Sequence, residues 1–350
     1  MSINQPRWKE PEYTITQVNK AGVIYNSVNV TDEEKAQALK IIDNWRAAHA
    51  YPLHVFYMNL RQKTAHREDI LVAERLKRLD SIINKLQRQE GMKLARMQDL
   101  GGCRMILPKL EEVYRYSNSL KESRIRHELK KEYDYIARPK ISGYRSLHLV
   151  YRFKTDTKGK DIFNQYPMYI EVQFRTHLQH LWATAVETIG LFTNQALKAG
   201  QGEESIKRFF LVVSALFAIK EDCPVPPETV DNEGLLIEEI KAINKKEHIL
   251  DMLRAIRAVI DHEGDNVPDK KGYYILRLDY NNRMLKKLFF KPSETEKANK
   301  TYELLEKKRE KEEDIVLVRA SSFTSVRAAY PNYFLDIGEF VTLVEEYINT

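Results

Sequence analysis

Residues 168–175 alternate between apolar and polar side chains, and this run constrains the possible folds of the chain most. A period of two places successive side chains on opposite faces of a strand. The apolar members, which would face a core, are Met168, Ile170, Val172 and Phe174. The run therefore predicts a half-buried strand whose open face carries a carboxylate, an amide and a guanidinium, from Glu171, Gln173 and Arg175.

The other periodic segments mix helices and strands without regular alternation. Apolar residues at helical spacing predict helices over residues 31–45, 69–89, 111–121, 178–192 and 203–220. Short strand patterns cover residues 103–107 and 147–154. Because parallel βαβ folds need strict alternation of strand and helix, this order predicts an α+β fold with a mixed β-sheet flanked by helices.

Three prolines within a short segment divide the chain. Proline fixes φ and removes a backbone donor, so Pro224, Pro226 and Pro227 predict a stiff linker. A chain of 350 residues is expected to form about two domains. We place them at residues 1–222 and 231–350, joined by the linker at 223–230.

The second half is predicted to be a smaller α+β domain. Helical patterns cover residues 235–260, 293–312 and 337–348, and strand patterns cover residues 273–278, 286–290 and 315–318. Its sequence contains no Gly-rich loop, nucleophile elbow or metal-ligand motif. These features indicate a regulatory or binding domain.

The composition excludes several classes of protein. A hydrophobic fraction of 43% with 19 tyrosines excludes wholesale disorder. Cys103 and Cys223 lie far apart and residues 1–13 are polar, so we expect a reducing, cytoplasmic location. The longest apolar run, residues 209–219, is too short to span a membrane. Lys and Arg number 56 against 50 Asp and Glu, and their clusters indicate either a phosphate-rich partner or solvated faces.

Two carboxylates lie beside predicted strands. Asp99 precedes a glycine turn and a buried strand, where it can hold a metal ion at a sheet edge or serve as an ordinary turn residue. Glu171 can act as a general base or a metal ligand, or pair in a surface salt bridge. These two residues are the candidate acidic groups of a catalytic site.

Residues 134–148 contain the densest group of functional side chains. They place aromatic rings, a glycine turn, basic residues and a histidine in a loop that enters a strand. Tyr144 can stack on a nucleotide base, and Lys140 and Arg145 can neutralise phosphates. An aromatic hairpin turn is the structural alternative. We interpret the segment as a nucleotide-binding loop.

The order and spacing of these segments over about residues 35–220 resemble the RelA/SpoT-type pyrophosphokinase (synthetase) domain, a nucleotidyltransferase-related fold. Residues 75–77 and 81–85 resemble its RxK and SIxxK ATP-binding segments, and residues 99–104 resemble its DxxGxR metal motif. Residues 135–148 resemble its GYRSLH loop. Residues 171–176, followed by Trp182 and Glu187, resemble its ExQxRT segment.

This resemblance implies a role for each matched position. The residues that would hold ATP are Arg75, Lys77, Lys85 and Arg88. The catalytic residues would be Asp99, Glu171 and Arg104, of which Asp99 and Glu171 would bind Mg²⁺ and Glu171 is also the candidate base. The residues that would bind the acceptor are Lys140, Tyr144, His148, Gln173 and Arg175, with Tyr144 stacking on its base.

The second half narrows the resemblance to the CapRel-type fused toxin–antitoxin members of this family. Too few residues precede the matched region to form a His-Asp hydrolase domain, and no His-Asp dipeptide occurs, so we expect no such domain. The linker and a C-terminal domain containing Tyr330-Pro331-Asn332-Tyr333 resemble that form. There a YxxY segment blocks the ATP site, and a phage protein, which we expect to be a capsid protein, relieves the block. Two core tyrosines are the structural alternative.

The resemblance thus implies an autoinhibited ATP pyrophosphokinase that modifies the 3′ end of tRNA and stops translation during phage infection. An alarmone synthetase acting on GTP, GDP or an adenine nucleotide is the second hypothesis. A non-catalytic nucleic-acid or partner-binding module is the third. Tyr144 would stack under guanine or a terminal adenine alike, so the sequence does not choose between the acceptors.

Overall fold

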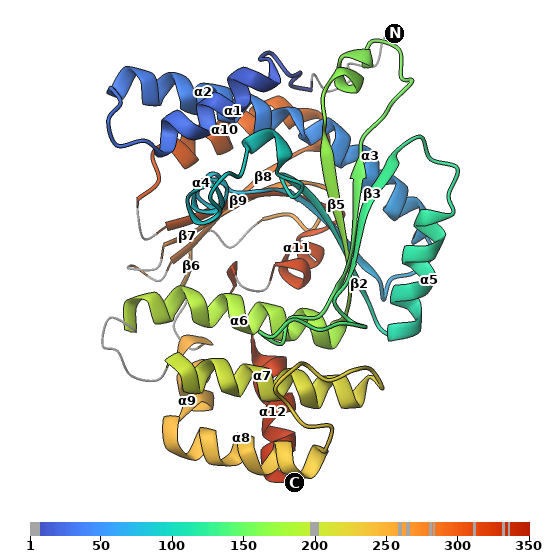
Figure 1. Ribbon diagram of the computed structural model, residues 1–350, viewed down its shortest axis with the longest axis vertical. Helices are drawn as coiled ribbons and strands as arrows, with labels where there is room; N and C mark the ends of the chain where they lie inside the picture. The colour runs from blue at the N-terminus through green and yellow to red at the C-terminus, as the bar shows by residue number, and fades with distance from the viewer. Residues whose placement is uncertain are drawn as a thin grey trace.

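The computed structural model describes residues 8–350 apart from residues 197–202, 258–260, 264–266, 280–281, 283, 311–312, 331–332 and 335–336. In this part of the chain the strands form one sheet of nine, in the order β3-β4-β5-β2-β1-β9-β7-β8-β6 (Figure 1). The strands are β1 Leu71–Leu76, β2 Gly101–Leu107, β3 Glu128–Asp134, β4 Leu147–Arg152, β5 Tyr169–Thr176, β6 Asp261–Glu263, β7 Gly272–Asp279, β8 Met284–Phe290 and β9 Glu313–Ala320. β2 and β5 are parallel, whereas β4 and β5 are antiparallel.

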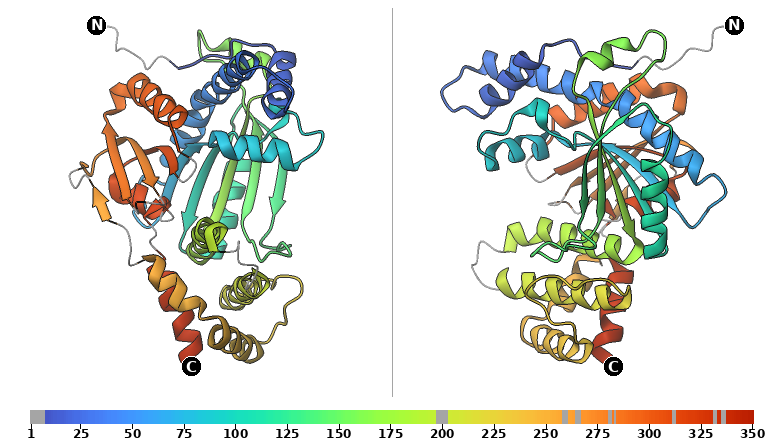
Figure 2. Two further views of the ribbon diagram at one scale, coloured as in Figure 1. Left: turned by 90° about the vertical axis from the view of Figure 1, so that its left-hand side faces the viewer. Right: turned by 45° about the vertical axis from the view of Figure 1, so that its right-hand side comes forward.

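Helices gather at both ends of this sheet and on its faces. The helices are α1 Ile15–Asn26, α2 Asp32–Ala48, α3 Ala50–Lys63, α4 Leu79–Arg88, α5 Leu110–Lys121, α6 His177–Ala196, α7 Glu203–Lys220, α8 Glu233–Glu247, α9 Ile249–Arg257, α10 Thr295–Lys307, α11 Phe323–Ala329 and α12 Gly338–Asn349. Both Figure 1 and Figure 2 show α1, α2 and α10 at one end and α7, α8, α9 and α12 at the other. A mixed sheet flanked by helices confirms the predicted α+β class.

Local sequence signals predicted many of these elements correctly. β5 alternates between buried and partly exposed residues over most of its length, as its period of two requires. α2 begins after Thr31, whose side chain accepts a hydrogen bond from the Glu34 amide at 3.2 Å, while the Thr31 amide donates to the Glu34 carboxylate at 2.8 Å. This reciprocal cap satisfies two amides that the helix itself leaves unpaired.

The predicted helix over residues 69–89 is wrong in its first part. Residues 71–76 form β1, which pairs antiparallel with β2 over all six residues, and the helix α4 starts only at Leu79. The apolar residues of this segment fit a helical period. However, β1 pairs with β2 along its whole length and with β9 at Glu74 and Arg75, and Val72 and Ala73 are buried, so this tertiary context overrides local periodicity.

The predicted helix over residues 235–260 is two helices, α8 and α9. His248 lies between them in the left-handed conformation, with φ of 52°, and this residue ends α8. Residues 258–260 of that prediction, and residues 311–312 of the predicted helix 293–312, lie outside the described residues. The sequence patterns did not reveal α1, α3, β3 or α11.

The two halves of the chain share one sheet. β9, from the second half, pairs antiparallel with β1 through Glu74 with Arg319 and Arg75 with Val318. One hydrophobic core also joins the halves, since it contains Phe209 and Phe340 together. Residues 223–230 connect α7 to α8. Within the described residues, no helix combines the length and apolar character that crossing a bilayer would need.

Candidate active site

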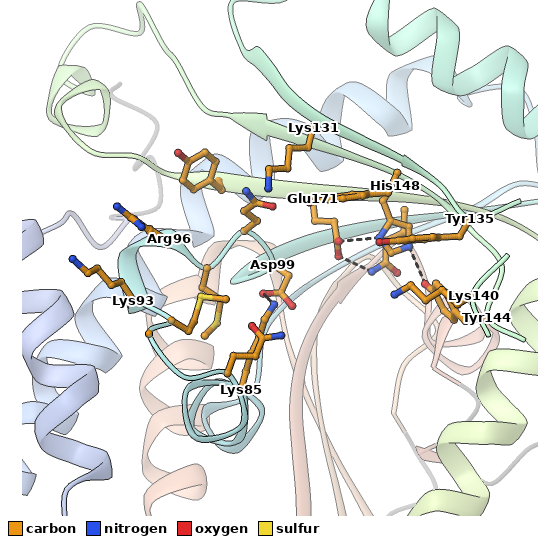
Figure 3. Close-up of a pocket in the computed structure, with 18 of the residues that line it drawn as sticks. Lys85, Lys93, Arg96, Asp99, Lys131, Tyr135, Lys140, Tyr144, His148 and Glu171 are labelled. Atoms are coloured by element: carbon orange, nitrogen blue, oxygen red, sulfur yellow. Dashed lines mark hydrogen bonds and ion pairs between the residues drawn. The ribbon is translucent and has the colours of Figure 1, made fainter. Parts of the chain in front are cut away.

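A cavity of about 1120 Å³ opens on the face of the sheet that carries Glu171 (Figure 3). The strands β3, β4 and β5, the helix α4 and the segment between α4 and β2 supply its walls. The predicted site residues that line it are Lys85, Asp99, Lys140, Tyr144, His148, Glu171 and Gln173. Folding therefore brings together side chains from segments that lie far apart in the sequence.

Asp99 lies just before β2 and contacts two lysines. Its carboxylate oxygens lie 2.9 Å from Lys77 Nζ and 3.0 Å from Lys85 Nζ. Burial tends to raise the pKa of Asp99, but the two lysines outweigh burial and hold that pKa below its ordinary value. Asp99 is therefore a carboxylate at neutral pH, with cations on either side.

Glu171 comes from β5, whose parallel register places it opposite Gly102 of β2, close in sequence to Asp99. His148 Nδ1 lies 2.9 Å from Glu171 Oε1, and Gln173 Nε2 donates to Oε2 at 2.7 Å. Burial tends to raise the pKa of Glu171, but these hydrogen bonds outweigh it and lower the pKa. In Figure 3, Asp99 lies between Lys85 and Glu171.

This pair of carboxylates offers the oxygen ligands that Mg²⁺ takes in proteins. In the part of the chain that the structure describes, no cluster of three or more His, Cys, Asp or Glu side chains could hold a metal ion. Mg²⁺ commonly takes one or two protein carboxylates and completes its shell with substrate phosphates and water. Asp99 and Glu171 are the residues that would hold it.

A chain of hydrogen bonds ends at Glu171. Arg175 Nη2 donates to Tyr144 Oη at 2.6 Å, and Tyr144 Oη lies 2.8 Å from His148 Nε2. Because a carboxylate needs a donor, Nδ1 of a neutral His148 must carry the proton, so Nε2 accepts from the Tyr144 hydroxyl. The chain thus fixes the orientation of Glu171.

Gly143, which precedes Tyr144, adopts a backbone conformation that favours glycine. Gly143 has φ of +85°, and an added Cβ would lie 3.1 Å from both Ser214 Cβ and Trp182 Cζ2. Neither the conformation nor the space suits another residue. Lys140 Nζ lies 5.1 Å from the Tyr144 ring centroid and 4.2 Å from that of Tyr135, so the loop groups a cation with two aromatic rings at the cavity wall.

The segment that supplies most of these residues is similar to known proteins. Residues 74–192 match the region found in RelA and SpoT proteins. The chain is 32% identical over 119 residues to the GTP pyrophosphokinase YwaC of Bacillus subtilis, which is 31% of this chain and 52% of that protein. It is 35% identical over 114 residues to the probable chloroplastic GTP diphosphokinase RSH3 of rice, over 31% of this chain and 14% of that protein.

The chain also resembles solved structures of small alarmone synthetases. With the small alarmone synthetase 1 of Bacillus subtilis bound to its product pppGpp, the identity is 22% and the TM-score is 0.39, covering 55% of this chain and 94% of that one. The sequence match spans about half the length of the Bacillus relatives. The RelA/SpoT region contains the residues around Asp99, Tyr144 and Glu171 described above.

Three of the four predicted ATP-binding residues lie at the cavity or directly beside it. Lys85 lines it, while Arg75 and Lys77 line a smaller adjoining space of about 70 Å³ that Asp99, Glu171 and Arg104 also border. Arg88 differs, because its side chain is exposed, hydrogen-bonds to the Asn84 carbonyl and borders neither space. The position of Arg88 does not support a direct ATP contact in this arrangement.

Arg145 contradicts its predicted role as a phosphate ligand. Its side chain is buried on the α7 side of the loop, where Nη1 pairs with Glu221 at 2.7 Å and Nε donates to Ser214 at 3.3 Å. A buried ion pair of this kind fixes the loop to α7. The basic residue was recognised correctly, but the pattern could not show that it points away from the cavity.

Arg145→Ala is expected to destabilise the fold by about 3–5 kcal/mol, because it leaves the Glu221 carboxylate buried without its charge partner. The neighbouring Arg138→Ala, at an exposed position of the same loop, should change stability by less than about 0.5 kcal/mol. Urea unfolding of both variants measures the difference. Equal urea midpoints for the two variants would show that the Arg145–Glu221 ion pair makes no net contribution to the free energy of unfolding.

Three exposed cations at the cavity were not among the predicted site residues. Lys93, Arg96 and Lys131 line it, and Figure 3 shows them on the side away from Lys140. Lys131 belongs to a basic cluster that is visible in the sequence, whereas Lys93 and Arg96 lie in a segment without a recognisable motif. Together they extend the positive charge beyond the ATP-binding candidates.

The C-terminal half reaches the same region through Tyr330. This ring is 2% exposed, and the guanidinium carbons of Arg75 and Arg104 lie 5.7 and 5.8 Å from its centroid. Arg104 Nη1 also donates to the Ala329 carbonyl at 3.2 Å. Burial raises the pKa of Tyr330 to about 12, so it remains a neutral ring in contact with two cations.

Tyr333 lies close by and contacts the residue before α4. Its hydroxyl accepts a hydrogen bond from Arg78 Nη1 at 3.3 Å, and Arg78 also pairs with Asp314. Both tyrosines are buried, and Pro331 and Asn332 between them lie outside the described residues. The segment is therefore in contact with the proposed ATP-binding surface as well as with the core.

Proposed function

We propose that this protein is an Mg²⁺-dependent pyrophosphokinase that uses ATP as donor. The observation that carries the proposal is the meeting of Asp99 and Glu171 in one cavity that Lys85 and Tyr144 also line, with Lys77 reaching Asp99 from the adjoining space. Phosphoryl-transfer enzymes work mainly by positioning and by neutralising the charge of the donor. The names of the relatives, GTP pyrophosphokinase and GTP diphosphokinase, support the same class of reaction.

Different residues of the site are proposed to carry out different parts of the reaction. The lysines and arginines neutralise the triphosphate, and Mg²⁺, when bound, adds positive charge there. Glu171 takes the proton of the acceptor hydroxyl, whose oxygen attacks the β-phosphorus of ATP. The bond from that phosphorus to the α–β bridging oxygen breaks, so AMP leaves and the acceptor carries a new pyrophosphate.

We propose the 3′ end of tRNA as the acceptor. Lys93, Arg96 and Lys131 extend the positive charge over the cavity, which suits a polyanion better than a single nucleotide. A purine nucleotide is the second candidate acceptor, and the names of the relatives favour it. That reaction would make the protein an alarmone synthetase.

The C-terminal half is proposed to act as a fused antitoxin. Tyr330 lies over Arg75 and Arg104, so it occupies cations that the triphosphate would need. A phage protein, for which a capsid protein is our candidate, would bind the C-terminal half in an arrangement that withdraws Tyr330. The product would then block translation during infection.

One assay separates these hypotheses. The Tyr330→Ala variant is incubated with γ-³²P-ATP and Mg²⁺ in parallel with tRNA, GDP, GTP and an adenine nucleotide. Label on tRNA supports the leading proposal, and label on a nucleotide alone makes the protein an alarmone synthetase. If no acceptor is labelled and the protein does not bind ATP, the remaining hypothesis is a non-catalytic binding module.

Two substitutions at Tyr144 separate stacking from hydrogen bonding. Tyr144→Ala should raise the KM of the acceptor about 5- to 150-fold, since stacking is worth about 1–3 kcal/mol per base. Tyr144→Phe keeps the ring but loses the contacts to Arg175 and His148, so kcat should fall about tenfold with the acceptor KM nearly unchanged. Initial rates at varied acceptor and varied ATP test this. An equal rise in both KM values would make Tyr144 purely structural.

A further inference from the structure

Side chains of the C-terminal half hold the N-terminus of α4. The first amide groups of a helix lack partners within it, and Arg78, the residue at the cap position, provides no side-chain cap. The Leu79 amide instead donates to Glu306 Oε1 of α10 at 3.1 Å. A carboxylate at this end also interacts favourably with the helix dipole.

Glu306 is itself fixed in a nearly buried cluster. Arg46 Nη2 of α2 lies 2.6 Å from Glu306 Oε2, and the Tyr302 hydroxyl donates to Oε1 at 3.0 Å. The Arg46 and Glu306 side chains are only 3% and 7% exposed. Figure 2 shows α10 beside the N-terminal helices from two directions. The cap therefore comes from a rigid contact between α2 and α10.

Two further ion pairs join the same regions. Arg309, just after α10, pairs with Asp80 in the first turn of α4, and Asp314 of β9 pairs with Arg78. Three carboxylate contacts thus cross between the halves within three consecutive residues of α4 and its cap. This density distinguishes the start of α4 from an ordinary surface contact.

The held helix carries a residue of the proposed site. α4 has 10 residues, a length at which a helix without tertiary support is marginal. About two turns after the cap position it presents Lys85, whose Nζ lies 3.0 Å from Asp99. Displacement of the start of α4 would therefore move Lys85 relative to Asp99.

We infer that Glu306 is a positioning residue of the ATP site, and that α10 stays docked on α4 in the active enzyme while the segment carrying Tyr330 moves. This inference deepens the proposed function and rests on it for its catalytic consequence. It makes the C-terminal half a part of the enzyme as well as its inhibitor. The opposite arrangement, in which Glu306 only holds the C-terminal half closed, predicts an effect of opposite sign.

Hydrogen exchange of the full-length chain tests the cap without any substrate. Glu306→Gln should raise the exchange rate of the amides at the start of α4 roughly tenfold, because the neutral amide weakens the charge-assisted hydrogen bond to Leu79 and leaves Arg46 without its counter-charge. Glu296→Gln, at an exposed position of the same helix, should leave α4 unchanged. Unchanged exchange of α4 in Glu306→Gln would overturn the inference, whether or not the protein is a pyrophosphokinase.

The direction in which Glu306→Gln changes pyrophosphate transfer then distinguishes the two arrangements. In the Tyr330→Ala background, adding Glu306→Gln should lower transfer at limiting ATP roughly tenfold, and Glu306→Gln alone should not activate the wild-type chain. Activation by Glu306→Gln alone would overturn the inference. If that variant unfolds, Arg309→Gln provides the second test, because it removes the Asp80 contact at a less buried site and should act in the same direction more weakly.

Discussion

Asp99→Asn and Glu171→Gln are each expected to lower pyrophosphate transfer by about 10²–10⁴-fold. Glu171 is the proposed base, and a positioned base contributes about this much to a proton-transfer step. Asp99 keeps two lysines in place as well as facing the cavity, so its loss removes both a proposed Mg²⁺ ligand and the charge that positions Lys77 and Lys85. Transfer of label from γ-³²P-ATP, measured in the Tyr330→Ala background, gives the rate.

The stability of these variants tests whether the loss is catalytic. Glu171→Gln keeps an oxygen that can accept from His148, so its thermal midpoint should stay within about 2 °C of the parent. Asp99→Asn leaves two lysines facing a neutral amide, and we expect a fall of no more than about 4 °C. The controls Asp156→Asn and Glu128→Gln remove exposed carboxylates of surface ion pairs and should leave both rate and midpoint unchanged. A near-parental rate in either site variant would exclude that residue from the reaction.

Tyr330→Ala is expected to raise activity by about 10- to 100-fold and to be toxic when expressed without phage. A closed state favoured by about 2.7 kcal/mol keeps activity near one per cent. Two cation–π contacts and the burial of one aromatic ring can supply this energy. Removing the ring frees Arg75 and Arg104 for the triphosphate. Growth after induction and label transfer by the purified variant measure the two effects.

Three companion variants make this result specific. Tyr330→Phe keeps the ring in contact with both arginines and should stay largely inactive. Tyr333→Phe keeps the ring but loses the hydroxyl contact to Arg78, and it should activate by a few-fold at most. Tyr330→Ala with Asp99→Asn should be harmless, because the site opens but cannot react. If Tyr330→Ala expresses harmlessly and transfers no label, inhibition through this ring is wrong, and the C-terminal half would be an assembly or targeting domain.

The sequence predicted the candidate site better than it predicted the surroundings of that site. The open face of β5, with Glu171 and Gln173, follows from a period of two that depends on neighbouring residues alone. The loop around Tyr144 was recognised from its density of functional groups, and it does line the cavity. The prediction that Arg145 binds phosphate was wrong. The direction of its side chain depends on the contact with α7, which lies far along the chain, and local sequence does not show that contact.

Sequence alone determined the α+β class, the cap of α2, the strand β5 and the identity of the acidic and aromatic residues that meet in the cavity. Each depends on local periodicity, or on functional residue types that lie close together in the sequence. Tertiary structure decided that residues 71–76 are a strand, because β2 and β9 pair with them. It also decided that Glu306 caps α4 and that Tyr330 covers Arg75 and Arg104. The contacts of Glu306 and Tyr330 join residues more than 200 positions apart, so the packing of the whole chain selects these partners and no local pattern records them.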